Sequence, residues 1–566
     1  MMAVRLLASL CLVGAALAPV AAADAKPQPK AKPPKLIVFM AIDGLPQRQV
    51  LAYQDQLAPD GFNRFLKRGS WFANAHYGHA HTVTGAGHAT MLTGAYPHRT
   101  GIISNEWRDA LTGAREYCAG DTTATYIGHA TNPLDGTSPK NLKVETVGDV
   151  LRRAHPQSKV IAISGKDRGA ILPAGKTGTA YMYMGSSGHF ASTTYYMQEH
   201  PAWVTAFNAA KPADRYFRSE WKAVLPEAAY ARSVADNQPW FGPAGGGLPM
   251  RFSAAEDAEP GPNFYGGLLR GPFGDALTLD FARAALAGEQ LGQDSAPDIL
   301  SISLSGHDYV NHAFSAESRL SHDHVLHLDR LLQSFWQDLD AKVGKDQYVV
   351  VLTADHGFMP AVEHSASQGH ASGKVDGTQS LARINQGLEA QFGPGKWLLG
   401  NSGSTLLLDK QLLASKGQDA NTVAEAARTL LLAEPGFAAA YTRAELLSGS
   451  RESEPLFAQM RKSWHADVSG DVQYVLKPYW MFAGRAVATH GSPYAYDTHV
   501  PILTYGPAWI GKGRVDTRVE VVDIAPTLAG LLGIAPPATS EGKPLPVAKP
   551  SRSGDDKSAP GRPKRI

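Results

Sequence analysis

This chain of 566 residues lacks a large excess of positive or negative charge, and it has only two cysteines. Its 54 Lys and Arg residues nearly balance its 52 Asp and Glu residues, which leaves a formal net charge of +2 at pH 7. No basic surplus favours nucleic acid or an anionic membrane surface, so we expect no nucleic-acid partner. Hydrophobic residues make up 43% of the chain and charged residues 19%, a composition typical of a large globular protein.

A long apolar run is lacking too, even at the N-terminus, where the sequence has the layout of a secretory signal peptide. Arg5 precedes an apolar run from Leu6 to Leu17, and the small residues Ala21 to Ala23 follow. A membrane anchor needs about 20 apolar residues, and this run is shorter. We therefore expect residues 1–23 to be cleaved, the mature protein to be periplasmic or secreted, and no stable membrane insertion.

Removal of this signal would leave a single cysteine. Cys11 lies in the apolar run and leaves with it, so Cys118 has no partner for an intrachain disulfide. The surrounding sequence, REYCAGDT, includes no base that would activate a thiol. We therefore expect a buried or unreactive thiol at Cys118 rather than a nucleophile.

Two polar tails flank one large expected domain at residues 36–546. Residues 24–35 are rich in Pro and Lys and predict a solvated linker, and residues 547–566 predict a disordered basic tail. A stretch rich in Trp, Tyr, Gly and Pro predicts an insertion at about 111–297 that covers the functional site. We expect a second insertion at about 375–488.

Three short apolar runs predict the centre of an α/β domain. They lie at residues 36–44, 298–308 and 348–357, and each is continuous rather than alternating, as in strands buried on both faces of a parallel sheet. Residues from Ser318 to Val343 have helical spacing and complete a strand–helix–strand unit. We expect a central, mostly parallel sheet with helices on both faces, and ligands at the carboxyl ends of its strands.

Carboxylates and imidazoles follow these strands, a mixture of ligands that suits zinc. Asp308 and His312 are four apart, so a helical turn would point both the same way. Singly, each residue has an ordinary explanation, such as a turn or a helix cap. Several strand-terminal carboxylates with associated histidines are hard to obtain by chance, and together they predict a metal site. The six candidates are Asp43, Asp308, His312, Asp355, His356 and His490.

A hydroxyl within HTVTGAGHATMLTG is the candidate nucleophile. Thr84 is followed by Gly85, Ala86 and Gly87, which predict a small-residue turn, and then by a helix-like stretch. The start of a helix offers free N–H groups and a positive dipole end to an anion. Coordination to a metal would lower the pKa of the hydroxyl enough for attack. The alternative reading is a Thr that caps the helix.

A pair of cations follows a β-like run farther along. Lys166 and Arg168 are two apart, and in extended backbone both would reach one anion while Asp167 turns away. Arg offers a planar fork and Lys a point charge. A solvated loop is the alternative for this pair, because charged residues are mostly exposed.

These motifs resemble the alkaline phosphatase superfamily, most closely its PafA/PhoK-like branch of exported bacterial alkaline phosphatases with a threonine nucleophile. The resemblance extends from about Leu36 to about Pro546 and implies an alkaline-phosphatase-like α/β sandwich with insertions over the active site. In that family a T-G-x-G-H-A segment carries the nucleophile, which implies Thr84 rather than Thr82.

The resemblance also implies how phosphate is bound. A G-I-x-x-N-x-W segment of the family contacts the phosphate, which implies Asn105 in GIISNEW. A K-x-R pair marks the phosphomonoesterases of this branch, which implies Lys166 and Arg168 as phosphate-binding residues.

Two Zn²⁺ ions are implied as cofactors. The distant histidine of the family precedes a glycine, which favours His490 over His499. One implied site consists of Asp308, His312 and His490. The other consists of Asp43, Asp355, His356 and Thr84.

The implied activity is hydrolysis of phosphate monoesters by in-line attack of Thr84, with a phosphothreonine intermediate. We expect small-molecule phosphate monoesters as substrates and a monomeric enzyme. A phosphodiesterase or nucleotide pyrophosphatase of the same superfamily is the main alternative, although a diester offers less charge to Lys166 and Arg168. An arylsulfatase lacks its maturation motif here, and a phosphoglycerate mutase relative would use serine. A non-catalytic exported protein that binds metal or phosphate is the remaining alternative.

Overall fold

The structure is a computed structural model that describes residues 32–241, 245–548 and 550. The described residues from Pro33 onward form one compact unit. The predicted signal peptide, most of the predicted linker and most of the predicted C-terminal tail lie outside the described residues and stay predictions. Within the described ranges, no helix combines the length and the apolar character needed to cross a membrane.

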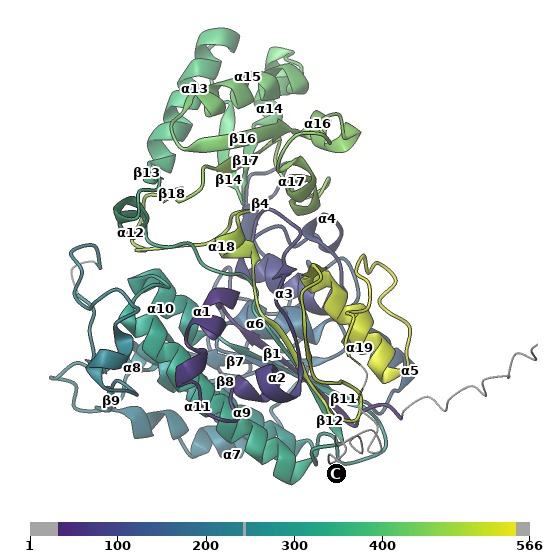
Figure 1. The fold of residues 1–566 in the computed structure, drawn as a ribbon. Coiled ribbons are helices and arrows are strands. Elements are labelled where there is room, and N and C mark those ends of the chain that lie inside the picture. Colours follow the sequence, from purple (N-terminus) through teal and green to yellow (C-terminus); the bar gives the residue numbers. More distant parts are fainter. Residues whose placement is uncertain (1–31, 242–244, 549, 551–566) are drawn as a thin grey trace, which may run out of the picture. The chain divides into compact units, whose positions relative to one another are not determined.

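A nine-stranded mixed sheet forms the centre of this unit (Figure 1). Five adjacent strands, from β12 to β7 in the order below, run parallel, while β19 and β8 pair antiparallel at either side of them. The predicted, mostly parallel sheet is therefore confirmed. In spatial order the strands are β20 (Gly513–Val515), β2 (Ser70–Phe72), β19 (Ile502–Tyr505), β12 (Tyr348–Thr353), β1 (Leu36–Ile42), β11 (Asp298–Leu304), β6 (Val160–Ser164), β7 (Thr179–Met184) and β8 (His189–Ala191).

The three predicted strands are β1, β11 and β12, and every residue in them is buried. Continuous Val, Ile and Leu runs suit this position because both faces of such a strand must be apolar. The register aligns Ala41 of β1 with Ser303 of β11 and with Thr353 of β12. The carboxyl ends of the three strands therefore lie level, which brings the residues that follow them together.

Helices cover both faces of the sheet, as the full burial of its central strands requires. α11 (Arg319–Lys342) packs on α9 (Pro272–Gly288), which contacts β6 and β11. α3 (Thr84–Thr93) packs on α6 (Asp167–Ala174), which contacts β6, β7 and β11. Ser318 caps α11 by accepting a hydrogen bond from the Ser321 backbone N–H, so the predicted helix between Ser318 and Val343 is confirmed.

A second sheet with its own apolar core lies within residues 375–488, which we call the second sheet region. It has four strands with helices beside them, and Leu406, Val472 and Leu388 are buried in its core. In spatial order its strands are β14 (Leu398–Ser402), β15 (Thr405–Leu408), β17 (Val472–Leu476) and β16 (Phe437–Thr442), and its largest helices are α13 (Gly377–Phe392) and α15 (Ala420–Ala433).

The segment at about 111–297, which we expect to be an insertion, also forms part of the central sheet. It includes β6, β7 and β8 and so supplies three strands of the central sheet. The β-like run that precedes Lys166, VIAIS at Val160–Ser164, is therefore a strand of the central sheet and not part of a covering segment.

Candidate active site

Three carboxylates meet where the central strands end. Asp43 follows β1, Asp355 follows β12, and Asp308 lies in the first turn of α10 (Gly306–Phe314), the helix after β11. Their exposed fractions are 0%, 0% and 3%. Such a concentration of buried carboxylates is costly unless cations or hydrogen-bond donors compensate it.

Asp308, His312 and His490 form one group whose atoms could share a metal ion. The Nε2 atom of His312 lies 3.3 Å from Asp308 Oδ1, and that of His490 lies 3.5 Å from the same oxygen. The predicted helical turn from Asp308 is confirmed by α10, which points the carboxylate and the imidazole of His312 the same way.

A second group consists of Asp43, Asp308 and His356, so Asp308 belongs to both groups. The resemblance implies Asp355 and Thr84, rather than Asp308, beside Asp43 and His356 in this set. Asp355 lies beside the group, with Oδ2 at 3.4 Å from His356 Nε2, while Asp43 Oδ1 is 3.5 Å from the same nitrogen. The rings of His356 and His490 stack at 3.4 Å, which joins the two groups.

The adjacent Asp355 and His356 converge because of the backbone at Gly357. A β-carbon at Gly357 would stand 2.2 Å from the Tyr496 carbonyl oxygen. Asp355 Oδ1 accepts a hydrogen bond of 3.0 Å from the Gly44 N–H, which ties the end of β12 to the end of β1. Close packing of three chain segments thus requires glycine and brings the two side chains to one side.

The donor set fits divalent metal ions. In each of the three histidines Nδ1 lies beside a backbone carbonyl oxygen. The distance is 2.9 Å from His312 to Ala488 O, 2.8 Å from His490 to Thr82 O and 2.9 Å from His356 to Gly357 O. A carbonyl can only accept, so Nδ1 carries the proton, and in a neutral histidine Nε2 then has a lone pair beside carboxylate oxygens, an arrangement that a cation between them would stabilise. Buried atoms without a hydrogen-bond partner include Asp43 Oδ1, Asp308 Oδ1, Asp355 Oδ2 and His356 Nε2.

Lys166 supplies the positive charge within this cluster. Its Nζ lies 2.7 Å from Asp43 Oδ2 and 2.6 Å from Asp308 Oδ2. Burial, with the neighbouring Asp355, holds the pKa of Asp43 well above its usual value. Burial acts the same way on Asp308, but Lys166 and His312 outweigh it and hold the pKa of Asp308 well below its usual value. Asp308 is therefore the more firmly ionised of the two.

Thr84 is the first residue of α3, whose first turns pack against Asp355 through Gly87 and His88. Val83 takes the N-cap position without a side-chain bond, so the capping alternative for Thr84 is wrong. The predicted turn at Gly85 and Gly87 is also wrong, because both lie within the helix. Their smallness serves close packing instead, since a β-carbon at Gly87 would stand 2.2 Å from Asp355 O. Thr84 itself is 1% exposed.

Asn105 lies against the same helix start. Its Oδ1 accepts a hydrogen bond of 2.7 Å from the Gly85 N–H, which fixes the amide and orients its NH₂ group away from that N–H. A β-carbon at Gly85 would stand 3.2 Å from Asn105 Oδ1. The structure thus places Asn105 next to Thr84.

Lys166 and Arg168 line one pocket of about 450 Å³, as expected for two cations that meet one anion. The predicted extended backbone is confirmed at Lys166, the N-cap of α6, but is wrong at Arg168, because the helix begins at Asp167. Arg168 Nη1 donates to Tyr117 Oη at 3.1 Å, and Arg168 Nε is buried without a hydrogen-bond partner. The expectation that Asp167 turns away is wrong, because Asp167 lines the same pocket and accepts hydrogen bonds from the Gly136 N–H and from Tyr117, whose hydroxyl also accepts from Arg168.

His499 lies apart from this cluster, whereas Cys118 lies beside Gly85 and its N–H donates to Asn105 O at 2.9 Å. His499 stacks on His76 at 4.6 Å and its Nε2 lies 3.0 Å from Ala73 O, so only His490 stands beside Asp308. Cys118 is fully buried, and burial raises the pKa of its thiol to about 12, which makes it unreactive as expected.

Two supporting residues were missed by the sequence reasoning. His88 Nδ1 lies 2.9 Å from Thr84 O and 3.3 Å from Asp355 Oδ2, and its position four residues after Thr84 was an available signal. Asp497 accepts hydrogen bonds from the Gly491 and Ser492 N–H groups, which hold the loop after His490. Nothing in the local sequence of Asp497 indicates this role.

Several known proteins are similar to this chain over nearly its whole length. It is 33% identical over 517 residues to alkaline phosphatase PafA of Elizabethkingia meningoseptica, covering 90% of this chain and 94% of PafA. It is 36% identical over 526 residues to alkaline phosphatase PhoK of a Sphingomonas species, covering 90% of each. The crystal structure of wild-type PafA matches with a TM-score of 0.84 at 32% identity, covering 91% of this chain and 98% of PafA.

A second PafA structure, with the same TM-score and 31% identity, carries a Thr-to-Ser change and replacements of Asn, Lys and Arg by Ala; it covers 91% of this chain and 98% of that one. The family model of type I phosphodiesterase / nucleotide pyrophosphatase matches residues 37–493. Fold, site and relatives define a phosphoric monoester hydrolase of the alkaline phosphatase superfamily. The chain belongs to the type I phosphodiesterase / nucleotide pyrophosphatase family and, within the superfamily, to the PafA/PhoK-like alkaline phosphatases.

Proposed function

We propose that this protein is an exported alkaline phosphatase that binds two zinc ions and hydrolyses small phosphate monoesters through a phosphothreonine intermediate on Thr84. The observation that carries the proposal is the pair of carboxylate–imidazole groups that share Asp308 beside the start of α3. Export rests on the N-terminal sequence pattern alone.

The first ion would be held by Asp308, His312 and His490, and the second by Asp43, Asp355, His356 and Thr84, with Asp308 between the two groups. Carboxylate and imidazole donors of this kind suit zinc. When bound, the ions would supply Lewis-acid stabilisation of the oxygen atoms whose charge changes in the reaction.

The residues of the chain would then act on the phosphate directly. Thr84 Oγ1 loses its proton and forms a bond to phosphorus while the bond to the leaving alcohol breaks on the opposite side. Water next cleaves the Thr84–phosphate ester and regenerates the hydroxyl. Asn105, Lys166 and Arg168 would bind the nonbridging oxygens, where fixed donors stabilise developing charge.

Two cations at the phosphate favour monoesters over diesters, because a monoester presents one more free charged oxygen. The PafA variant supports this set of residues, since a threonine, an asparagine, a lysine and an arginine are the residue types of Thr84, Asn105, Lys166 and Arg168. The phosphodiesterase alternative is supported by the description of the matching family model, type I phosphodiesterase / nucleotide pyrophosphatase.

Hydrolysis of p-nitrophenyl phosphate and of bis-p-nitrophenyl phosphate, with and without a chelator, tests the proposal. We expect monoester turnover to dominate, to be lost with chelator and to return with zinc. The Thr84→Ala variant should lose at least about 10³-fold in kcat, and acid-quenched wild-type enzyme should carry phosphate on the peptide containing Thr84.

Thr82→Ala is the matched control. The Thr82 hydroxyl donates to Ser492 O at 2.9 Å and so has a structural role near the same helix. Monoester turnover that survives Thr84→Ala unchanged contradicts the mechanism, and a strong preference for the diester moves the enzyme to the phosphodiesterase alternative.

A further inference from the structure

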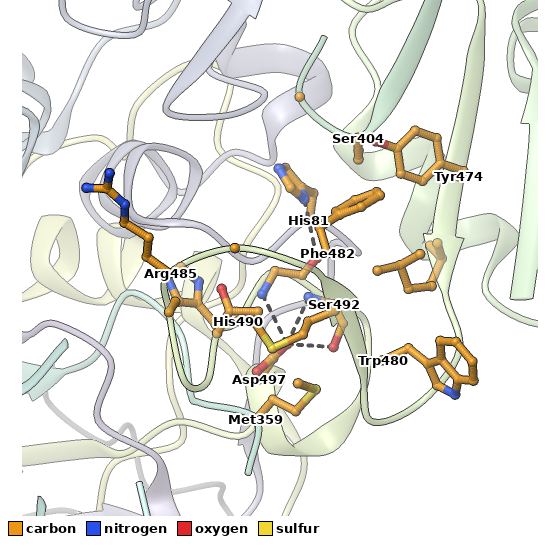
Figure 2. Close-up of a pocket in the computed structure, with 18 residues that line it drawn as sticks. His81, Met359, Ser404, Tyr474, Trp480, Phe482, Arg485, His490, Ser492 and Asp497 are labelled. Carbon is orange, nitrogen blue, oxygen red and sulfur yellow. Dashed lines mark hydrogen bonds between the residues drawn. The ribbon is translucent and has the colours of Figure 1, made fainter. Parts of the chain in front are cut away.

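A pocket of about 270 Å³ lies beside His490, apart from the pocket that Lys166 and Arg168 line. Figure 2 shows its two sides: Arg485 and His490 on one, and Tyr474 and Trp480 on the other. Its lining is dominated by apolar and aromatic groups, with Phe482 completing a set of three aromatic side chains. Such a lining favours a ring that carries little charge.

Two parts of the chain build this pocket. Tyr474 belongs to β17 of the second sheet region, and Trp480 and Phe482 belong to β18 (Trp480–Phe482), which pairs with β13 (Gly373–Val375). His490 and Met359 come from the loops around the metal-ligand candidates. The second sheet region thus supplies the aromatic wall, and the central domain supplies the wall next to the chemistry.

The wall at His490 is held firmly. The fully buried Asp497 carboxylate accepts hydrogen bonds from the Gly491 N–H at 3.1 Å and the Ser492 N–H at 2.9 Å. The backbone oxygen of the same residue accepts from the Gly357 N–H at 2.6 Å. Asp497 therefore fixes the turns that follow both His356 and His490, and the pocket keeps a constant position relative to the reacting centre.

We propose that this pocket binds the aromatic ring of a phenol-type leaving group, so that aryl phosphates are a preferred substrate class. The inference rests on the proposed function. The proposed function places Thr84 with the second metal-ligand group, so the leaving oxygen of an in-line displacement would depart toward the first group, which consists of Asp308, His312 and His490. The group attached to that oxygen therefore extends beside His490, where the pocket begins.

Size and chemistry agree with one aromatic ring. An apolar cavity of about 150 Å³ is enough to bind benzene, and this pocket is larger. Rings that pack edge-on or offset against Tyr474, Trp480 and Phe482 gain attraction beyond the burial of their surface. Alkyl leaving groups would gain much less.

Competitive inhibition by two phosphonates separates ring binding from phosphate binding. In benzylphosphonate a methylene replaces the ester oxygen of phenyl phosphate, and ethylphosphonate has the same link without the ring. For the zinc-loaded wild-type enzyme we expect benzylphosphonate to have an inhibition constant about 10-fold lower than that of ethylphosphonate. Inorganic phosphate is measured alongside as the probe of the phosphate site alone.

Trp480→Ala should reduce this ratio toward one and leave inhibition by inorganic phosphate unchanged. Ser404→Phe fills the pocket from the turn before β15 while Trp480 stays in place, and it should abolish the ratio as well. This second variant keeps the test valid if Trp480→Ala fails to fold. Trp71→Ala, at a half-buried tryptophan on β2 outside the pocket, is the matched control and should keep the wild-type ratio.

A wild-type ratio near one, or a ratio that neither Trp480→Ala nor Ser404→Phe changes, overturns the inference. Failure of the proposed function gives a different result, because inorganic phosphate would then not inhibit and ethyl phosphate would not be hydrolysed by the wild-type enzyme.

Discussion

The central sheet and the second sheet region differ in strand direction and in burial. The central strands β12, β1, β11 and β6 are parallel and fully buried, and their carboxyl ends point at one place. The second sheet region is antiparallel, and its strands β14 and β16 are partly exposed. Every metal-ligand candidate comes from the first region or its loops, whereas the second contributes aromatic side chains. Under the proposed function, the reaction takes place in the central region, and the second sheet region adds an aromatic wall to the pocket beside His490.

The largest effect is expected at the carboxylate shared by both ligand groups. Asp308→Asn should lower turnover of a small alkyl phosphate by at least about 10³-fold, because one change weakens both groups. Bound zinc, measured by elemental analysis after dialysis, should fall as well.

Asp329→Asn is the control for loss of a buried carboxylate. Asp329 is fully buried and accepts hydrogen bonds from the Ala58 and Phe62 N–H groups, remote from the strand ends. It should cost stability but retain zinc and turnover. Equal zinc loss in both variants would contradict the proposal that Asp308 serves both metal-ligand groups.

Removal of the buried cation should have the next largest effect. Lys166→Ala is expected to lower monoester turnover by about 10²-fold, since it removes a charged donor from the developing charge. Diester turnover should fall less, so the ratio of p-nitrophenyl phosphate to bis-p-nitrophenyl phosphate rates is the measurement. Lys410→Ala, which breaks an ion pair with Asp471 in the second sheet region, should leave this ratio unchanged.

A smaller effect on turnover, with a clear pH signature in stability, is expected at Asp497. Burial raises its pKa to about 7, from an ordinary value of 3.8. The native state therefore keeps a proton that the unfolded chain has released between these values, so this group makes stability fall as pH rises from about 4 to 7. At its steepest the slope is about 1.4 kcal/mol per pH unit.

Asp497→Asn keeps an acceptor for the Gly491 and Ser492 N–H groups and removes the titration. Thermal unfolding of both metal-free proteins across this pH range should show the slope in wild type and its absence in the variant. Parallel curves for the two proteins would refute the assignment.

The smallest effect on turnover is expected from the core of the second sheet region. Leu406→Ala, at a fully buried position, should cost about 2–5 kcal/mol of stability, yet leave hydrolysis of a small alkyl phosphate unchanged below the unfolding temperature. Leu300→Ala in β11 is the matched change in the central sheet and should lower turnover too, since β11 leads into Asp308. A loss of turnover in Leu406→Ala would contradict this expectation and would show that the second sheet region affects the reaction itself.

Much of the central region could be predicted from the sequence because its signals are local. Continuous apolar runs that end in Asp indicate buried parallel strands, and the spacing of Asp308 and His312 indicates one helical turn. β1, β11, β12 and the helix after Ser318 follow from these patterns.

Other features depend on contacts that no local pattern records. Asp308 enters both ligand groups because β1 and β11 are neighbours in register, and Lys166 lies between Asp43 and Asp308 only through the pairing of β6 with β11. The glycines after Thr84 suggested a turn, whereas their smallness permits helix α3 to approach Asp355. The antiparallel strands of the second sheet region are short, and β14 and β16 are partly exposed, so their sequences carry weak strand signals.

The hydrogen bonds of the Gly44 peptide constrain when this part of the protein can fold during synthesis. Its N–H reaches Asp355, 311 positions later, and its carbonyl oxygen accepts from Asn311, 267 positions later. A ribosome must therefore add most of the chain before the end of β1 meets its partners. Contacts of such sequence separation form slowly, so a chain that stops before β12 has neither ligand group complete and cannot retain metal at this place. Under the proposed metal assignment, a chain must extend through His356 and His490 before both ligand groups are complete, so retention of metal would report synthesis of the chain at least to His490.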